Sequence, residues 1–106
     1  MILINVKFSV KPEFAEDWPS ITEDFTRATL AEPKNLWFEW SRSIAEPNTY
    51  VLIEAFEDDG AEAHVNSEHF AEMQREFPKY LACTPDIVNG QIPATGWDKM
   101  AEITVD

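Results

Sequence analysis

The chain has 106 residues, of which 20 are acidic and 8 are basic, so its formal net charge is −12. A chain of this length predicts one small domain over residues 1–106, which buries roughly 65% of its unfolded surface. The acidic balance, without clustered Lys and Arg, excludes nucleic acid and anionic membranes as expected partners. One cysteine permits no internal disulfide, and "MILINVKFSV" is too short and polar for a signal peptide or a membrane span. We therefore expect a cytoplasmic protein.

The first half of the chain carries both strand and helix patterns. Apolar side chains at every second position of residues 2–10 predict a strand. Residues 11–30 have apolar positions at helical spacing and predict an amphipathic helix, which Pro19 either kinks or begins in its first turn. Residues 36–43 and 49–56 predict two strands joined by the turn formers of "IAEPN".

The second half continues with two helices and two strands. "EDDGAEAHV" predicts a short helix capped by one of its aspartates, and a longer helix begins at Asn66 or Ser67 and is kinked near Pro78. Residues 85–92 predict a fourth strand and residues 100–105 a short fifth one. The resulting order, β-α-β-β-α-β, predicts an α+β ferredoxin-like domain with both helices on one face of an antiparallel sheet.

The middle strands carry apolar side chains on both faces. Phe38 and Trp37 point in opposite directions, as do Leu52 and Ile53. Two helices cover only one face of such a sheet, so the other face requires a second cover. A second copy of the sheet meets that need, and we expect a homodimer.

The two histidines, His64 and His69, do not have the spacing of a metal site. On one helix they would point about 140° apart, whereas helical metal ligands lie three or four residues apart. Neither a Cys-x-x-Cys nor a His-Glu-x-x-His motif occurs. We therefore predict no metal site. Cys83 lies in another segment and is interpreted as a small buried apolar residue.

The segment "EPKNLWFEWSRSIAEPNTYVLIEAFEDDGAEAHVNSEHF" resembles the antibiotic biosynthesis monooxygenase (ABM) family, including its quinol monooxygenases. The matching features are an EPG-like turn, an aromatic strand, a DPN-like turn and, most specifically, "AHVNSEHF"; "VKFSVKPE" fits the first strand of the family. The resemblance implies a dimeric α+β barrel in which two sheets pack face to face. It also implies oxidation of quinol-like phenols by dioxygen, with no metal, haem or flavin cofactor.

Some positions depart from the family pattern. Lys34 replaces the glycine of EPG, and Phe56 replaces a tryptophan often found before the acidic turn. Related haem-degrading proteins have a histidine where this chain has Gln74, and a first-strand asparagine where the alignment places Val6. These two differences argue against haem degradation.

The resemblance also implies a set of site residues. His64 corresponds to a histidine that faces the ligand cavity, where an imidazole acts as a hydrogen-bond partner or general base toward a phenolic hydroxyl. The structural alternative is that His64 caps or packs at a junction of two helices, and for His69 local bonding in the first helical turn is the simpler interpretation. The expected substrate-binding residues are Val6, Trp37, Phe38, Glu54, Phe56, His69 and Phe70.

Two of these expectations leave alternatives open. Because Trp37 and Phe38 face opposite ways, one is expected to line a cavity, where a planar aromatic ligand would stack, and the other to line the dimer barrel. Glu54 is either an edge carboxylate or a cavity acid with a raised pKa.

The predicted function is that of a cofactor-independent monooxygenase acting on a small phenol or hydroquinone. In this hypothesis His64, or a nearby water, removes the phenolic proton, and the electron-rich anion reduces dioxygen inside an aromatic cavity. Two other classes remain open: an isomerase or lyase that uses His64 with Glu54 as an acid/base pair, and a non-catalytic ligand-binding dimer. The fold alone does not choose among them.

Overall fold

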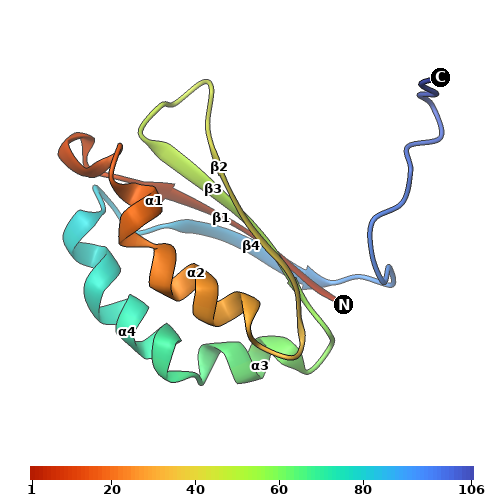
Figure 1. Ribbon diagram of the computed structural model, residues 1–106, viewed down its shortest axis with the longest axis horizontal. Coiled ribbons are helices and arrows are strands. Elements are labelled where there is room, and N and C mark those ends of the chain that lie inside the picture. Colours follow the sequence, from red (N-terminus) through yellow and green to blue (C-terminus); the bar gives the residue numbers. More distant parts are fainter.

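The computed structural model describes residues 1–106 and contains one four-stranded antiparallel sheet with all of its helices on one side (Figure 1). The strands are β1 (Ile2–Ser9), β2 (Asn35–Arg42), β3 (Thr49–Phe56) and β4 (Asp86–Gln91), in the spatial order β2-β3-β1-β4. The helices are α1 (Trp18–Ile21), α2 (Glu23–Leu30), α3 (Gly60–Val65) and α4 (Glu68–Glu76), with 3₁₀ turns at Pro12–Phe14 and Phe77–Tyr80. The predicted α+β ferredoxin-like fold is confirmed.

The single helix predicted over residues 11–30 is divided into three pieces. Pro12 begins a 3₁₀ turn, and Pro19 lies in the first turn of α1. The N–H groups of a first turn have no partner within the helix, so the N–H that proline lacks costs no helical hydrogen bond. Between α1 and α2, the Thr22 hydroxyl donates to the Trp18 carbonyl at 2.9 Å, a back-bond of the kind that bends helices. The division lets both Trp18 and Phe25 enter the core, where they are buried.

Aromatic side chains form the core between the sheet and the helices. Trp18 is fully buried, and its ring centroid lies 5.7 Å from Phe8, 5.7 Å from Trp40 and 5.1 Å from Phe77. Such tilted and edge-on contacts suit the ring quadrupoles. Replacing a buried aromatic of this size by alanine costs about 3–5 kcal/mol, so this cluster holds the helix layer on the sheet.

Helices α3 and α4 are separate, and the junction between them is fixed by Ser67. The Ser67 hydroxyl accepts from the Phe70 N–H at 3.2 Å and donates to the His64 carbonyl at 2.6 Å, which confirms the predicted helix start. The aspartate cap predicted for α3 is wrong. Asp59 occupies the N-cap position, but its carboxylate makes no capping bond and pairs with Lys34 instead.

Gly60, the first residue of α3, permits a close approach between segments. A Cβ atom at this position would lie 2.7 Å from Lys34 Cβ and 3.1 Å from Phe56 Cβ. The first distance is shorter than real Cβ contacts, so only glycine lets α3 begin here. This glycine therefore sets the position of α3 against the end of β3 and the turn that precedes β2.

The opposite face of the sheet is largely uncovered; the ring of Trp97 packs there, on that of Trp37. Val51 and Ile53 are half-buried there, and Val88 is exposed. Beyond Trp97 the C-terminal segment leaves the body of the molecule (Figure 1). The strand predicted over residues 100–105 does not form: these residues pair with neither of the two edge strands, β2 and β4.

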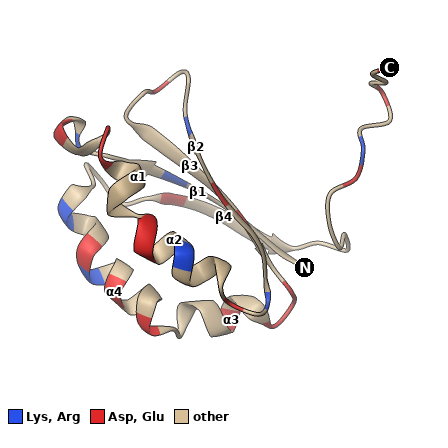
Figure 2. Cartoon of the chain, viewed as in Figure 1, with Lys and Arg blue, Asp and Glu red and all other residues tan.

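Acidic residues are spread over the helices and connecting loops, and basic residues occur singly between them (Figure 2). The predicted burial of Cys83 is wrong: its thiol is exposed, because the segment between the last 3₁₀ turn and β4 runs over the surface. None of the helices has the length and apolar character that crossing a membrane requires.

Candidate functional site

A cavity of about 530 Å³ lies between the sheet and the helices α3 and α4. Its walls are mainly aliphatic and aromatic side chains from β1, β3, β4, α3 and α4, and its polar lining residues are Glu54, Glu62, His64 and Asn89. No lysine or arginine lines it. A volume of this size, with few polar groups, is typical of pockets for small organic ligands.

Glu54 lies in the centre of the sheet. It pairs with Ile4 of β1 on one side and Phe38 of β2 on the other, so it is not an edge residue. Only 5% of Glu54 is exposed, and burial raises the pKa of its carboxyl to about 7, with the nearby charge of Glu32 as the second cause. At neutral pH the Glu54 carboxyl is therefore divided between its acid and its carboxylate form.

His64, in the last turn of α3, is 3% exposed and has its two ring nitrogens in different surroundings. Nδ1 lies 2.7 Å from Glu32 Oε2, whereas Nε2 lies 3.7 Å from Glu54 Oε1 on the cavity side. A carboxylate only accepts hydrogen bonds, so Nδ1 carries the hydrogen and donates to Glu32. Burial lowers the pKa of His64, against the opposing effect of Glu32. The neutral ring thus turns an unprotonated Nε2 toward the cavity.

Two phenylalanines hold the His64 ring in this orientation. The Phe56 ring centroid lies 4.9 Å away at a tilt of 32°, and the Phe70 centroid lies 5.1 Å away, edge-on. Phe56 is fully buried at the end of β3. Phe70 lies in the first turn of α4, and its backbone N–H donates to the Ser67 cap. The orientation of the imidazole is therefore fixed by packing as well as by its bond to Glu32.

Glu32 was missed by the sequence reasoning, and it connects the two histidines. It lies in the turn between α2 and β2, and its Oε2 atom contacts His69 Nε2 at 2.5 Å as well as His64 Nδ1. The expectation that the histidines point about 140° apart is wrong, since His64 ends α3 and His69 begins α4. The available signal was the glutamate of the "EPKN" turn, which the family resemblance included only as a turn former.

The bridging contact brings three potential metal ligands together. One ligand atom from each of Glu32, His64 and His69 lies within 4.8 Å of the other two. Two imidazoles and a carboxylate form a ligand set that zinc and related ions accept. The sequence-based prediction of no metal site thus stays a prediction, while the spacing argument on which it was based does not hold.

The predicted substrate-binding residues divide into two groups. Val6, Glu54 and Phe70 line the cavity together with His64. Phe38 and Phe56 are buried in the adjoining core, outside the cavity wall. His69 lines a separate groove between α2 and α4.

Trp37 lies on the uncovered face of the sheet, where its ring centroid is 5.1 Å from that of Trp97. The expectation that either Trp37 or Phe38 lines the cavity is therefore not met. Phe38 is enclosed by Phe25 and Trp40, at centroid distances of 5.6 and 5.9 Å.

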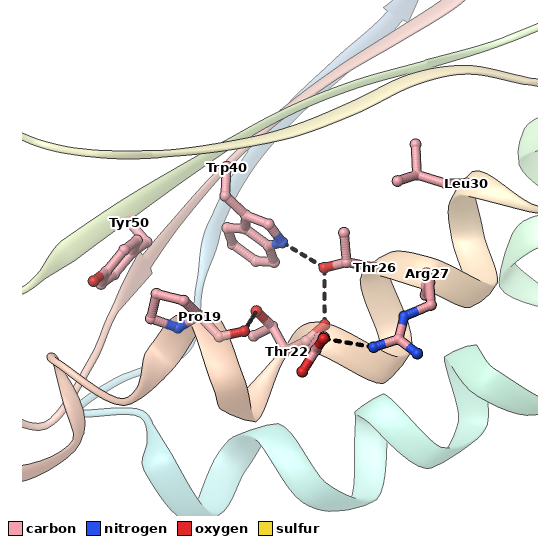
Figure 3. A pocket seen from close by; sticks show the side chains of 8 residues that line it. Pro19, Thr22, Thr26, Arg27, Leu30, Trp40 and Tyr50 are labelled. Atoms are coloured by element: carbon pink, nitrogen blue, oxygen red, sulfur yellow. Dashed lines mark hydrogen bonds and ion pairs between the residues drawn. The ribbon is translucent and has the colours of Figure 1, made fainter.

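A second hollow, of about 300 Å³, lies between α2 and β2 (Figure 3). Its polar groups are engaged with one another: Trp40 Nε1 donates to the Thr26 hydroxyl at 2.9 Å, which donates to the Thr22 carbonyl at 2.8 Å. Arg27 pairs with Glu23 on its margin at 2.5 Å (Figure 3). This hollow contains no unpaired base, so the cavity beside His64 is the better candidate for chemistry.

The sequence pattern that defines the family "Antibiotic biosynthesis monooxygenase" matches residues 1–76. The fold and the cavity described above agree with this match, and the chain belongs to the ABM family.

Individual relatives give the same result. A Bacillus subtilis protein described as "Putative monooxygenase YcnE" is 26% identical over 93 residues, which cover 87% of this chain and 98% of that protein. A structure described as "Putative antibiotic biosynthesis monooxygenase from Nitrosomonas europaea" has a TM-score of 0.79 at 24% identity, covering 89% of this chain and all of that one. A conserved protein from Methanosarcina mazei has a TM-score of 0.78 at 20% identity over 85% of this chain and 90% of its own. Family membership and the Bacillus relative support a monooxygenase-type function.

Proposed function

We propose that the protein is a cofactor-independent monooxygenase that oxidises a small phenol or hydroquinone with dioxygen. The observation that carries this proposal is the position of His64: its Nδ1 is held by Glu32 at 2.7 Å, and its Nε2 faces an apolar cavity beside Glu54. A neutral imidazole with one nitrogen fixed and the other free is well suited to accept a proton from a bound hydroxyl.

The charge of the cavity favours an uncharged substrate. Glu54 and Glu62 are its only ionisable lining groups besides His64, and no cationic side chain faces them. A carboxylated or phosphorylated ligand would be repelled by these groups and would lose its hydration without compensation. A neutral aromatic molecule with one hydroxyl would instead bury its ring against Val6 and Phe70 and place the hydroxyl at His64.

The first chemical step is proton transfer. The phenolic O–H gives its proton to Nε2 of His64, and the imidazolium that forms is stabilised by the carboxylate of Glu32 on its other side. Glu54 in its acid form can donate a hydrogen bond to the phenolate oxygen. Glu32 is thus a positioning residue, whereas His64 and Glu54 contact the substrate.

The second step needs no electrons from outside the substrate. The phenolate gives one electron to dioxygen, and the resulting radical and superoxide combine at an unsubstituted ring carbon to form a C–O bond. Protonation gives a hydroperoxide, which loses water as its O–O bond breaks and leaves a quinone carbonyl. One oxygen atom enters the product and the other leaves as water, so a phenol plus dioxygen balances to a quinone plus water.

Oxygen uptake with a panel of uncharged phenols and hydroquinones tests this function. Consumption of one dioxygen per quinone formed, unchanged by EDTA and without flavin or haem absorbance in the purified protein, is the expected result. Loss of turnover on chelation, with recovery on adding iron or copper, would contradict the cofactor-independent mechanism.

A second function is favoured by the 3.7 Å separation between His64 Nε2 and Glu54 Oε1. An acid and a base at this distance could move a proton between two atoms of an enolisable substrate, as an isomerase does. Deuterium exchange into such a substrate without oxygen would favour the isomerase, whereas oxygen-dependent quinone formation favours the monooxygenase. Ligand binding without either reaction would indicate a non-catalytic dimer.

We also propose that two copies pack through the uncovered face of the sheet. Half-buried Val51 and Ile53 and exposed Val88 lie on that face. Trp97, 72% exposed, and the apolar side chains of residues 100–105 extend beyond it and are available to a partner chain. Removal of residues 95–106 is expected to weaken the dimer more than it disturbs the fold of each copy.

A further inference from the structure

We propose that Glu32, His64 and His69 form a binding site for a divalent ion of the zinc type, whose binding prevents His64 from acting as a base toward the cavity. The three ligand atoms lie within 4.8 Å of one another, and Glu32 Oε2 is already 2.7 Å from His64 Nδ1 and 2.5 Å from His69 Nε2. Ligand atoms around a tetrahedral zinc ion are somewhat farther apart, roughly 3.3 Å for bonds near 2.0–2.1 Å. Glu32 would therefore have to move away from each imidazole nitrogen by less than about 1 Å, and the ligand atoms of the two histidines, which lie within 4.8 Å of each other, would have to reach the same spacing.

The chemistry and burial of the three groups suit such an ion. Two neutral imidazoles and one carboxylate, with a water as the fourth ligand, form a set that zinc uses in enzymes. The side chains of Glu32 and His64 are 14% and 4% exposed, whereas that of His69 is 23% exposed and leaves one side of the cluster open to solvent. The three ligands come from the α2–β2 turn, α3 and α4, so a bound ion would tie these segments together.

Glu54 supplies an independent reason to expect an ion at this position. Histidines that bind a metal through one nitrogen commonly donate the other N–H to a carboxylate. Glu54 Oε1 lies 3.7 Å from His64 Nε2, the nitrogen that remains free when Nδ1 binds the ion. A small rotation would bring that carboxylate into hydrogen-bond distance, and the outer partner of the metal-bound histidine is thus already in place.

The consequence for His64 follows from its single ring proton. In the metal-free protein Nδ1 carries the hydrogen and Nε2 has a free electron pair toward the cavity. When the ion binds Nδ1, the proton moves through solvent to Nε2, and the imidazole stays neutral. The nitrogen that faces the cavity then donates a hydrogen bond and can no longer take a proton from a substrate.

Isothermal titration of the purified protein with ZnCl₂, in millimolar Mg²⁺ to occupy exposed carboxylates, tests the binding. We expect one zinc ion per chain. The affinity should fall by at least about tenfold in both Glu32→Gln and His69→Gln, and two variants allow for a folding defect in either one. Cys83→Ser and Glu68→Gln are matched controls that remove an exposed thiol and an exposed carboxylate beside His69.

The proposal is overturned if the wild-type protein binds no zinc, if both ligand variants bind it as well as the wild type does, or if a control variant abolishes binding. The proton shift has its own readout, since ¹⁵N NMR of the imidazoles distinguishes the two tautomers. Zinc should convert His64 from the Nδ1–H form to the Nε2–H form, without any substrate present. A bound ion that leaves the Nδ1–H form unchanged would contradict the switch.

The effect on turnover rests on the proposed monooxygenase function. Saturating zinc should slow oxygen uptake by at least about tenfold, the lower part of the range for losing a general base, and this inhibition should be absent in His69→Gln. The two proposals fail separately. Zinc binding with the tautomer change but without oxygen uptake on any phenol would contradict only the proposed monooxygenase function. Oxygen uptake without zinc binding would contradict only the proposed metal site.

Discussion

The two faces of the sheet contain similar apolar side chains but have different surroundings. On the covered face, helices enclose a cavity in which Glu54 is 5% and His64 3% exposed. On the open face, Val88 is 66% exposed and Trp97 72%. The covered face isolates titratable groups from water, which is what changes their proton affinities. No titratable group is enclosed in this way on the open face. The apolar side chains of that face are suited to association with another chain.

This difference assigns separate roles to the two faces of one small sheet. Substitutions on the covered face should change pH dependence and turnover, whereas those on the open face should change assembly. Four substitutions test this division, taken from the largest expected effect to the smallest.

Glu54→Gln should have the largest effect, and it should depend on pH. Because the folded-state pKa of Glu54 is raised to about 7 from 4.5, the folded protein binds more protons than the unfolded chain between these values. The contribution of Glu54 to stability is therefore fully present below pH 4.5 and is lost as the pH rises to 7. A shift of this size corresponds to about 3 kcal/mol.

The neutral glutamine removes that loss. The two proteins should be about equally stable near pH 4.5, and the variant should become more stable, by up to about 3 kcal/mol, near pH 8. Denaturant unfolding across this pH range measures the difference, in which the opposite contribution of His64 cancels. Glu62→Gln, an exposed acid at the cavity margin, is the control and should stay within about 0.5 kcal/mol of the wild type. A pH-independent difference for Glu54→Gln would contradict the burial of an ionisable acid.

His64→Ala should lower turnover by roughly 100-fold, which is typical of the loss of a general base. The wild-type rate should rise with pH through an inflection below the ordinary histidine value of 6.5, because burial lowers the pKa of His64. That inflection should vanish in the variant. If His64 only packs between α3 and α4, the variant should instead lose about 1 kcal/mol of stability and keep the pH profile. The pH–rate curve and the melting temperature of this variant decide between the two roles.

Gly60→Ala should destabilise the fold by about 1–3 kcal/mol, the usual cost of overpacking. The added methyl group would meet Lys34 Cβ at 2.7 Å, so α3 must shift and His64 with it. Gly90→Ala is the matched control, because nothing lies within 4 Å of a Cβ at that position. Thermal unfolding compares the two, and equal effects would show that the α3 contact is not restrictive.

Ile53→Glu should raise the dissociation constant of the dimer by at least about tenfold, because it would bury a charge in the interface between the two sheets. Sedimentation should give a mass near twice 12.2 kDa for the wild type and a shift toward the monomer for the variant. Gln74→Glu adds the same charge at an exposed position of α4, on the helix side of the sheet, and should leave assembly unchanged. A wild-type protein that is monomeric at micromolar concentration would refute the barrel.

The fold could be predicted from the sequence because its strands carry strong local patterns. The predicted boundaries of β3 agree with the structure at both ends, and the Ser67 cap gave the start of α4. The division of the first helix at Thr22 was not visible, since the pattern of apolar positions continues through it. The strand over residues 100–105 was predicted from local composition, but a strand also needs a pairing partner, and the chain carries this segment away from both edge strands of the sheet.

The site could be predicted only in part, because some of its contacts join residues that are far apart in the chain. Val6, Glu54 and Phe70 were among the expected site residues and do line the cavity; strand alternation gives the direction of Val6 and the family resemblance indicates Phe70, whereas the sequence left Glu54 open between an edge and a cavity position. Glu32 could not, because its role depends on two histidines 32 and 37 positions away in the chain. The convergence of these histidines depends on a helix break between them, and a spacing argument that assumes one helix gives the opposite answer.

The tryptophan pairs have a spectroscopic consequence. Trp18 and Trp40 form an edge-on pair inside the core, with centroids 5.7 Å apart, while Trp37 and Trp97 form a pair on the open face, 5.1 Å apart and tilted by 39°. Indole transitions this close couple as excitons and give paired bands of opposite sign in the far-ultraviolet circular dichroism spectrum. The core pair reports on global unfolding, and the outer pair reports on whether the C-terminal segment is docked. Acrylamide quenching of the tryptophan fluorescence would then follow docking of that segment without any added label.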